Sequence, residues 1–196
     1  QNNSRIDVFA CGQIDSEGVR CGVIENAKKV TQVIAGIIRQ IKKDYRTGFQ
    51  NVSVNISDPN LEVINQVAHT HVPSSRVRQS ELDTVVKIVE SMVKIPQNHQ
   101  IINDITHYYT LDADPEPVSQ PIGKKADNLG VSMHLVSASN HHVETLETII
   151  HQSKLGVSNI VPNSMASSEP YLTQNEKDKG ICVVDIGAAP GSWSQY

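Results

Sequence analysis

The last stretch of the chain, Ile181–Tyr196, places the strongest constraint on the fold. Four apolar residues precede Asp185, and a short apolar run bounded by an acid and turn residues is typical of a fully buried strand. One further apolar residue leads into Gly187, Ala188 and Ala189. In α/β folds such a turn presents backbone N–H groups to a phosphate or a nucleoside. We therefore predict an α/β region with a candidate nucleotide-binding turn at Asp185, Gly187, Ala188 and Ala189.

This turn provides only part of a nucleotide site. Ile181–Ile186 is the last strand that we expect, and no strand is expected after the turn. Nucleotide pockets usually bury most of the ligand, and a single turn leaves the adenosine exposed. We therefore expect a vestigial site, without a bound cofactor, a metal ion or a catalytic role for this chain.

Composition describes a globular protein. The 196 residues are 38% hydrophobic and 19% charged, which excludes a disordered chain and leaves room for one large domain or two small ones. The net charge of −4 argues against a nucleic-acid surface, and no apolar run reaches the roughly 18 to 20 residues of a membrane span. Cys11, Cys21 and Cys182 form no CxxC pair, which favours a reducing, cytoplasmic location.

Hydrophobic periodicity predicts a mixed order of elements. Apolar residues three or four apart indicate helices, and short apolar or alternating runs indicate strands. In chain order we expect strand Ile6–Ile14, helix Val23–Lys43, strands Val52–Ile56 and Leu61–Val72, a helix capped by Ser80 and bounded by Pro96, strand His99–Tyr109, an exposed loop Asp112–Asn128, strand Val131–Ser137, a helix capped by Asn140 and ended by Gly156, strand Val157–Val161, segment Asn163–Leu172 and strand Ile181–Ile186.

This order indicates one domain interrupted by another. Residues 72–155 are expected to form a compact α+β insert, in which two helices with apolar faces at Leu82–Val93 and Val143–Ile150 cover a small sheet. Residues 5–71 and 156–180 are expected to form parts of one larger α/β domain, and residues 181–196 to begin another.

Other chemistry-bearing residues have ordinary structural explanations. His69 and His71 would share a strand face, and His141 and His142 are adjacent, but neither pair has a third ligand at a usual zinc spacing. Cys182, within an apolar strand, is expected to be a small core residue. We therefore predict neither a metal site nor a nucleophile.

Five stretches carry a family resemblance: Asn51–Ser57, Val93–Ile102, Val131–Val136, Met165–Thr173 and Gly180–Gly187. In their joint order and spacing they resemble the bacterial cell-division actin FtsA. Gln120-Pro-Ile-Gly123 is similar to the Asn-Pro-Val-Gly loop of that family, with Gln in place of Asn. The likeness covers most of the chain, from about Ile6 to Gly187.

The resemblance implies a fold and a function. It implies a partial actin-like, ribonuclease H-like domain 1A (5–71 and 156–180), an insert subdomain 1C (72–155) and the start of domain 2A (181–196). It further implies filament and divisome assembly through protein contacts, with the tubulin-like FtsZ and late division proteins as partners. The exposed face of the insert, with its Asp112–Asn128 loop, is the expected contact and self-association surface. For the intact protein it implies ATP, Mg²⁺ and peripheral association with the inner membrane at the septum, whereas no membrane segment and no nucleic-acid partner are expected here.

The C-terminal tail departs from that family and leaves an alternative. Where the family continues as Gly-Gly-Gly-Thr, Gly187 is followed by Ala188-Ala-Pro-Gly191. Asp185–Tyr196 resembles motif I of the FtsJ-type ribosomal-RNA methyltransferases, which bind S-adenosylmethionine. The alternative function is therefore a fragment of an S-adenosylmethionine-dependent RNA methyltransferase. Motif I should follow the first strand of a sheet with several later strands, and none is expected here.

Overall fold

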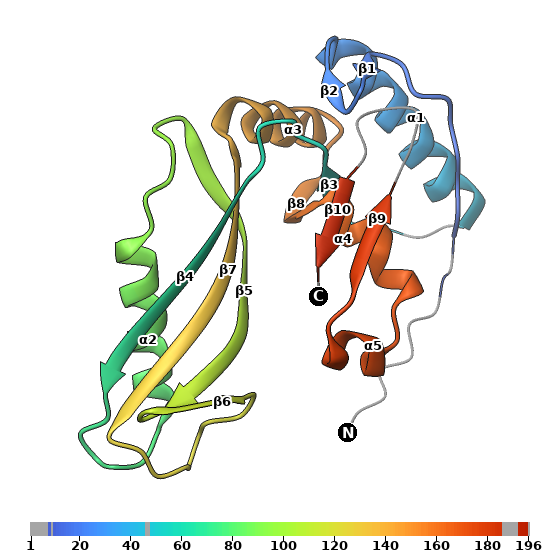
Figure 1. Cartoon of the computed structure of the whole chain (residues 1–196). Coiled ribbons are helices and arrows are strands. Elements are labelled where there is room, and N and C mark those ends of the chain that lie inside the picture. The colour runs from blue at the N-terminus through green and yellow to red at the C-terminus, as the bar shows by residue number, and fades with distance from the viewer. Residues whose placement is uncertain (1–7, 9, 46–47, 186–191, 196) are drawn as a thin grey trace. The chain divides into compact units, whose positions relative to one another are not determined.

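The computed structural model describes residues 8, 10–45, 48–185 and 192–195, and the chain divides into two compact units (Figure 1). The middle unit is Asn60–Asn140, and the outer unit combines Gln1–Pro59 with His141–Tyr196. Both the mixed α/β character and the interruption of one domain by another are as the sequence predicts.

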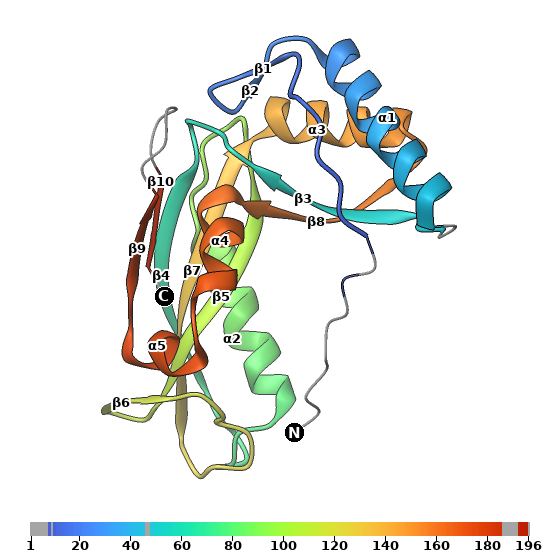
Figure 2. The same cartoon turned by 90° about the vertical axis from the view of Figure 1, so that its right-hand side faces the viewer.

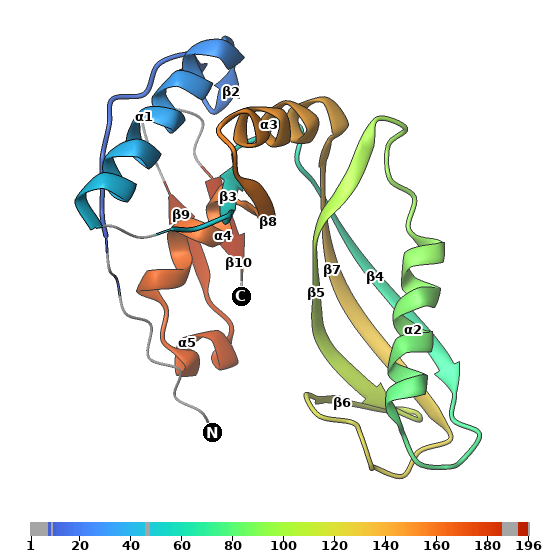
Figure 3. The same ribbon diagram turned by 180° about the vertical axis from the view of Figure 1, so that it is seen from behind.

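A four-stranded antiparallel sheet, in the order β4-β7-β5-β6, forms the middle unit. Its strands are β4 (Glu62–His71), β5 (His99–Leu111), β6 (Asp114–Val118) and β7 (Asn128–Ser139). Helix α2 (Gln79–Met92) lies along one face of this sheet, as Figure 3 shows. The pairing of β4 with β7 runs without a register shift from Glu62 opposite Ser137 to His71 opposite Asn128.

The core of the middle unit lies between α2 and the sheet. Successive strand residues point to opposite faces, so alternate residues of β4 and β7 face the helix. Helix α2 contributes Val85 and Val89, both fully buried. The buried cluster also contains Ala68, Val72, Val77, Ala126, Leu129, Val131, Met133 and Leu135.

The outer unit is built from many small elements (Figure 2). They are β1 (Val19–Arg20), β2 (Val23–Ile24), α1 (Ala27–Tyr45), β3 (Asn51–Ile56), α3 (Asn140–Gln152, of which Asn140 belongs to the middle unit), β8 (Gly156–Pro162), α4 (Asn163–Ser168), η1 (Glu169–Tyr171), α5 (Gln174–Lys179), β9 (Cys182–Asp185) and β10 (Ser192–Gln195). Strands β3 and β8, which precede and follow the middle unit in the chain, pair in parallel.

The two long helices of the outer unit differ in burial. Helix α3 buries Val143, Leu146, Ile149 and Ile150, as its apolar spacing predicts. Helix α1 buries Val30, and its residues Val33, Ile34, Ile37, Ile38 and Ile41 are half-buried. The sheet of β3 and β8 has two strands, so it offers a helix less surface than the sheet of the middle unit.

The insert boundaries differ from the expected 72 and 155. Strand β4 lies in the middle unit because it pairs along its whole length with β7. Helix α3 lies, from His141 on, in the outer unit, so α2 is the helix that covers the sheet of the middle unit. The apolar face at Val143–Ile150 is buried as expected, but it belongs to the other unit.

Several local expectations are corrected. Residues 10–14, expected in a strand, form none. The expected loop Asp112–Asn128 contains β6, whose two prolines are tolerated because it is an edge strand. Helix α2 begins after Arg78 rather than Ser80, and the Arg78 N–H donates to Glu81 Oε2 at 2.8 Å.

Two further corrections concern helix and strand ends. Gly156 begins β8 rather than ending a helix, and the chain turns after α3 at Lys154, whose φ is +63°. A strand does follow the turn after Asp185, because β10 pairs with β9 in an antiparallel hairpin. Cys182 is exposed rather than a core residue, since this hairpin is a two-stranded sheet.

Candidate functional site

The predicted nucleotide turn is described only at its start. Asp185 is the last residue of β9 and lies opposite Ser192 of β10. Gly187, Ala188 and Ala189 lie outside the described residues. The nucleotide-binding role of these four residues therefore stays a prediction.

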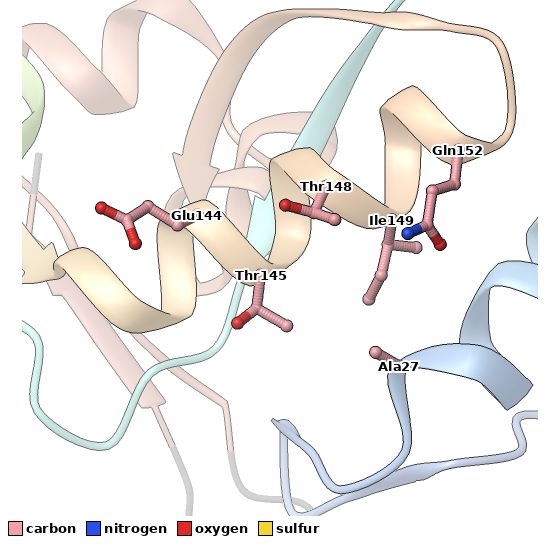
Figure 4. Close-up of a pocket in the computed structure, with 6 residues that line it drawn as sticks. All are labelled: Ala27, Glu144, Thr145, Thr148, Ile149 and Gln152. Atoms are coloured by element: carbon pink, nitrogen blue, oxygen red, sulfur yellow. The ribbon is translucent and has the colours of Figure 1, made fainter.

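A shallow hollow of about 320 Å³ lies between α3 and the start of α1 (Figure 4). It is lined by Ala27, Glu144, Thr145, Thr148, Ile149 and Gln152. Beside it, the Thr31 hydroxyl donates to Gln152 Oε1 at 3.2 Å, which ties the two helices together. Glu144 is the one ionisable group of this lining, so the hollow offers no pair of groups for acid–base chemistry.

The sheet face opposite α2 is the more informative surface. In β4, Val63, Asn65 and Val67 alternate with the residues that face the helix. Their partners in β7 include Ser132 and His134. We call this surface the open face: Val63, Asn65, Val67, Tyr108, Ser132 and His134, together with His107.

Polar contacts order the centre of the open face. The Nδ1 of His134 lies 2.8 Å from the Oδ1 of Asn65, so the ring donates through Nδ1–H. The rings of His107 and His134 stack with centroids 5.5 Å apart and planes 8° from parallel. Burial lowers the pKa of His134, and the charge of His107 lowers that pKa further. The neutral form of His134 is therefore favoured.

Apolar side chains flank this histidine pair. Val63 is 53% exposed, Val67 is 49% exposed, and Tyr108 is also among the exposed large residues. Exposed apolar side chains gathered on one sheet face, with polar groups among them, are typical of a protein-binding surface.

The segment that follows β6 is held in a defined conformation. Asp112 Oδ1 accepts hydrogen bonds from the backbone N–H groups of Asp127 and Asn128, at 2.7 and 2.9 Å. Arg76 donates to the carbonyl oxygen of Gly123, which has a φ of +83°. Lys124 and Lys125 are exposed beside this turn. The segment therefore presents two cations from a fixed backbone.

The structure gives the predicted histidines no shared metal site. His69 and His71 are exposed on β4, and His142 contacts Asp58. Within the described ranges, no three His, Cys, Asp or Glu side chains gather as metal ligands. Nor is any described helix long and apolar enough to cross a bilayer. Sequence reasoning did not find the pairing of His107 with His134; its only signal is that both lie in neighbouring predicted strands.

The chain is similar in sequence to known cell-division proteins. Residues 59–137 match the family model described as the SHS2 domain inserted in FTSA. FtsA of Neisseria meningitidis serogroup B is 25% identical over all of this chain and 47% of its own length. FtsA of Pseudomonas aeruginosa is 23% identical over 94% of this chain, and FtsA of Escherichia coli strain K12 is 22% identical over 93%.

A solved structure supports the fold. A chain of a PilM-PilN type IV pilus biogenesis complex superimposes with a TM-score of 0.51 at 18% identity. The match covers 95% of this chain and 49% of that one, and at this identity it shows the fold alone.

These matches cover only part of the related proteins. The chain spans less than half the length of the three FtsA relatives named above. The matched SHS2 range, 59–137, agrees closely with the middle unit, Asn60–Asn140. The chain is thus similar to FtsA cell-division proteins along its length, residues 59–137 match the model of the SHS2 domain that is inserted in FtsA, and the fold is partial and actin-like.

Proposed function

We propose that this chain is part of a cell-division protein and that its middle unit acts by binding other proteins in filament and divisome assembly. The observation that carries the proposal is the open face, where Val63 and Val67 remain about half exposed beside an ordered Asn65–His134 contact. Burying such apolar groups against a partner favours association at about 25 cal/mol per Å². The turn held by Arg76 adds two exposed cations to the middle unit, Lys124 and Lys125, and such charges guide association.

The partner assignment follows the relatives. The relatives named above are cell-division proteins. The partners to test first are therefore further copies of this chain, FtsZ and late division proteins. Such contacts would place the protein in the cytoplasm at the septum. The methyltransferase alternative has no support among the relatives named above, and its motif falls mostly outside the described residues.

The test is binding by surface variants of the middle unit. Val67→Lys places a charge on the open face at a half-exposed position, so folding should persist while binding falls at least tenfold. Lys124→Glu with Lys125→Glu should weaken the same interaction. Sedimentation of the chain alone measures self-association. Titration against purified FtsZ and late division proteins measures binding to other division proteins.

The matched control is Tyr171→Lys, which alters an 83% exposed aromatic residue of the outer unit. If this control weakens binding as much as Val67→Lys does, the open face is not the contact surface. If folded Val67→Lys protein retains full self-association and full binding to every division protein tested, the proposal fails.

We infer further that Asp185, Gly187, Ala188 and Ala189 form a vestigial nucleotide turn without tight binding in this chain. For the intact protein, the resemblance to FtsA implies ATP and Mg²⁺ as ligands. Calorimetry with ATP and with S-adenosylmethionine provides the test, because micromolar or tighter binding of either ligand would contradict the inference.

A further inference from the structure

Asp58 is an unusual residue because its charge is buried. Its side chain is 0% exposed. Of the buried residues in the described part of the chain, only Asp58 has an ionisable side chain. His142 Nδ1 lies 3.1 Å from Asp58 Oδ1, and the His142 side chain is itself only 16% exposed. A buried carboxylate is costly unless partners compensate it, and His142 is one partner of Asp58.

The position of the pair in the chain is equally specific. The first segment of the outer unit ends at Pro59, and the second begins at His141. Asp58 therefore stands directly before the point where the chain leaves the outer unit, and His142 directly after the point where it returns. Both residues belong to the outer unit, and their contact closes the base of the loop of chain that forms the middle unit.

A second contact holds the departing segment. Gly22, at a φ of +79°, approaches Ser57 so closely that a Cβ atom there would lie 2.6 Å from Ser57 Cβ and 2.8 Å from the Ser57 carbonyl oxygen. Only glycine fits such an approach without displacement of the backbone. The segment before the departure point is thus fixed by Gly22 at Ser57 and by His142 at Asp58.

We propose that the Asp58–His142 contact is a latch that fixes the two chain crossings between the units, and that opening it mobilises both crossings while the core of each unit stays folded. The buried cluster of the middle unit does not include these side chains, and the residues that α3 buries are Val143, Leu146, Ile149 and Ile150. This inference goes beyond the proposed binding function, because it concerns the chain crossings and not the open face.

Hydrogen exchange of the whole chain, read by mass spectrometry, tests the latch. His142→Ala should raise exchange at least tenfold in peptides that cover residues 58–62 and 139–142. Exchange in α2 and at the centre of β7 should not change, because these elements are packed in the middle unit.

His141→Ala is the matched control. Its ring is exposed and lies 6.2 Å from the ring of His142, between centroids. This variant shares the helix position and the residue type but leaves the contact with Asp58 intact. Exchange at the crossings should equal that of the unaltered chain.

A second variant separates a latch from general destabilisation. Asp58→Asn keeps the volume and removes the charge, so it should also raise exchange at both crossings. Because both changes remove the contact between these two side chains, the double variant should raise exchange by less than the two single effects combined.

Three outcomes overturn the proposal. The first is exchange at the crossings that matches the His141→Ala control. The second is a rise that spreads through α3, β3 and β8, which would mean that the pair supports the core of the outer unit. The third is full additivity of the two substitutions.

Discussion

The middle and outer units of this chain differ in how their apolar residues are used. The middle unit packs α2 on a four-stranded sheet and buries a continuous cluster around Val85, Val89 and Leu135. The outer unit distributes its strands over three two-stranded sheets, and α1 buries Val30 alone. A continuous segment of chain thus makes the more complete core, whereas the unit assembled from two separated segments leaves much of its apolar surface half-buried.

The difference shows where stability and binding reside. In the middle unit one face of the sheet supplies the core, and the other face carries the half-exposed Val63 and Val67. Stability and binding can therefore be altered separately there, by residues that alternate along the same strand.

The largest expected effect is at the core of the middle unit. Val89→Asp places an unpaired charge at a fully buried position of α2, and we expect it to lower the free energy of unfolding by about 4 kcal/mol or more. Denaturant unfolding followed by circular dichroism measures this. The neighbouring exposed Glu90→Gln should stay within about 0.5 kcal/mol, and equal effects of the two changes would mean that α2 does not pack as described.

A smaller effect compares two helices of the outer unit. Ile149→Ala removes a fully buried side chain from α3 and should cost about 3 kcal/mol. Ile34→Ala removes a half-buried side chain from α1 and should cost about 1 kcal/mol. Thermal unfolding of the two variants measures both losses of stability. A larger loss for Ile34→Ala would reverse the order of burial that distinguishes these helices.

The pH dependence of the open face should be smaller still. Because burial and His107 lower the pKa of His134 below 6.5, the unfolded chain binds more protons as the pH falls below that value. Stability is therefore complete above pH 6.5 and declines as the pH drops toward the lower folded pKa. Unfolding measured in peptides of the middle unit at several pH values should show this decline in stability. The variant His134→Gln should reduce the pH dependence. An unchanged pH dependence in that variant would assign it to other groups.

The smallest effect compares the starts of two helices, one in each unit. Backbone hydrogen bonds from Arg78 and from Thr173 lower the pKa values of Glu81 and Glu176. Each carboxylate stabilises its helix above the usual pKa of 4.5, and this contribution is lost as the pH falls through the lower folded pKa. Glu81→Gln and Glu176→Gln should each flatten the acid limb of local helix exchange. A side-chain hydrogen bond adds to the backbone one at both sites, from Ser80 to Glu81 and from the Thr173 hydroxyl to Glu176, so both changes should act; no change at either helix would contradict this reasoning.

Periodicity predicted most elements because burial follows it directly. The apolar faces of α2 and α3 and the strand at β4 were predicted correctly, since each element meets a core on one side. Periodicity does not say which sheet a helix covers, so α3 was placed in the wrong unit. β6 was missed because Pro115 and Pro117 are uncommon in strands and are tolerated only at an edge.

The open face needed information that no single strand contains. His107 reaches His134 at a register shift between Thr106 and Tyr108, and such irregularities change which face a side chain joins. The contact of Asp58 with His142 was equally hidden, because the two residues are far apart in the chain. Sequence order and resemblance located the unit that carries the site, whereas cross-strand register determined its residues.

The parallel pairing of β3 with β8 has a consequence for synthesis of the protein. Asn51 is paired with Gly156, so β3 leaves the ribosome long before its partner exists. The whole middle unit is made in between. Its β5 and β6 are neighbours in sequence and can pair early, whereas β4 pairs with β7, which is the last strand of the unit but is still made before β8. Early folding of this unit draws the ends of this long connection together and reduces the loop entropy that the later pairing must overcome. Slow translation through residues 60–140 would therefore favour correct assembly, and β3 would remain the segment most in need of protection until β8 emerges.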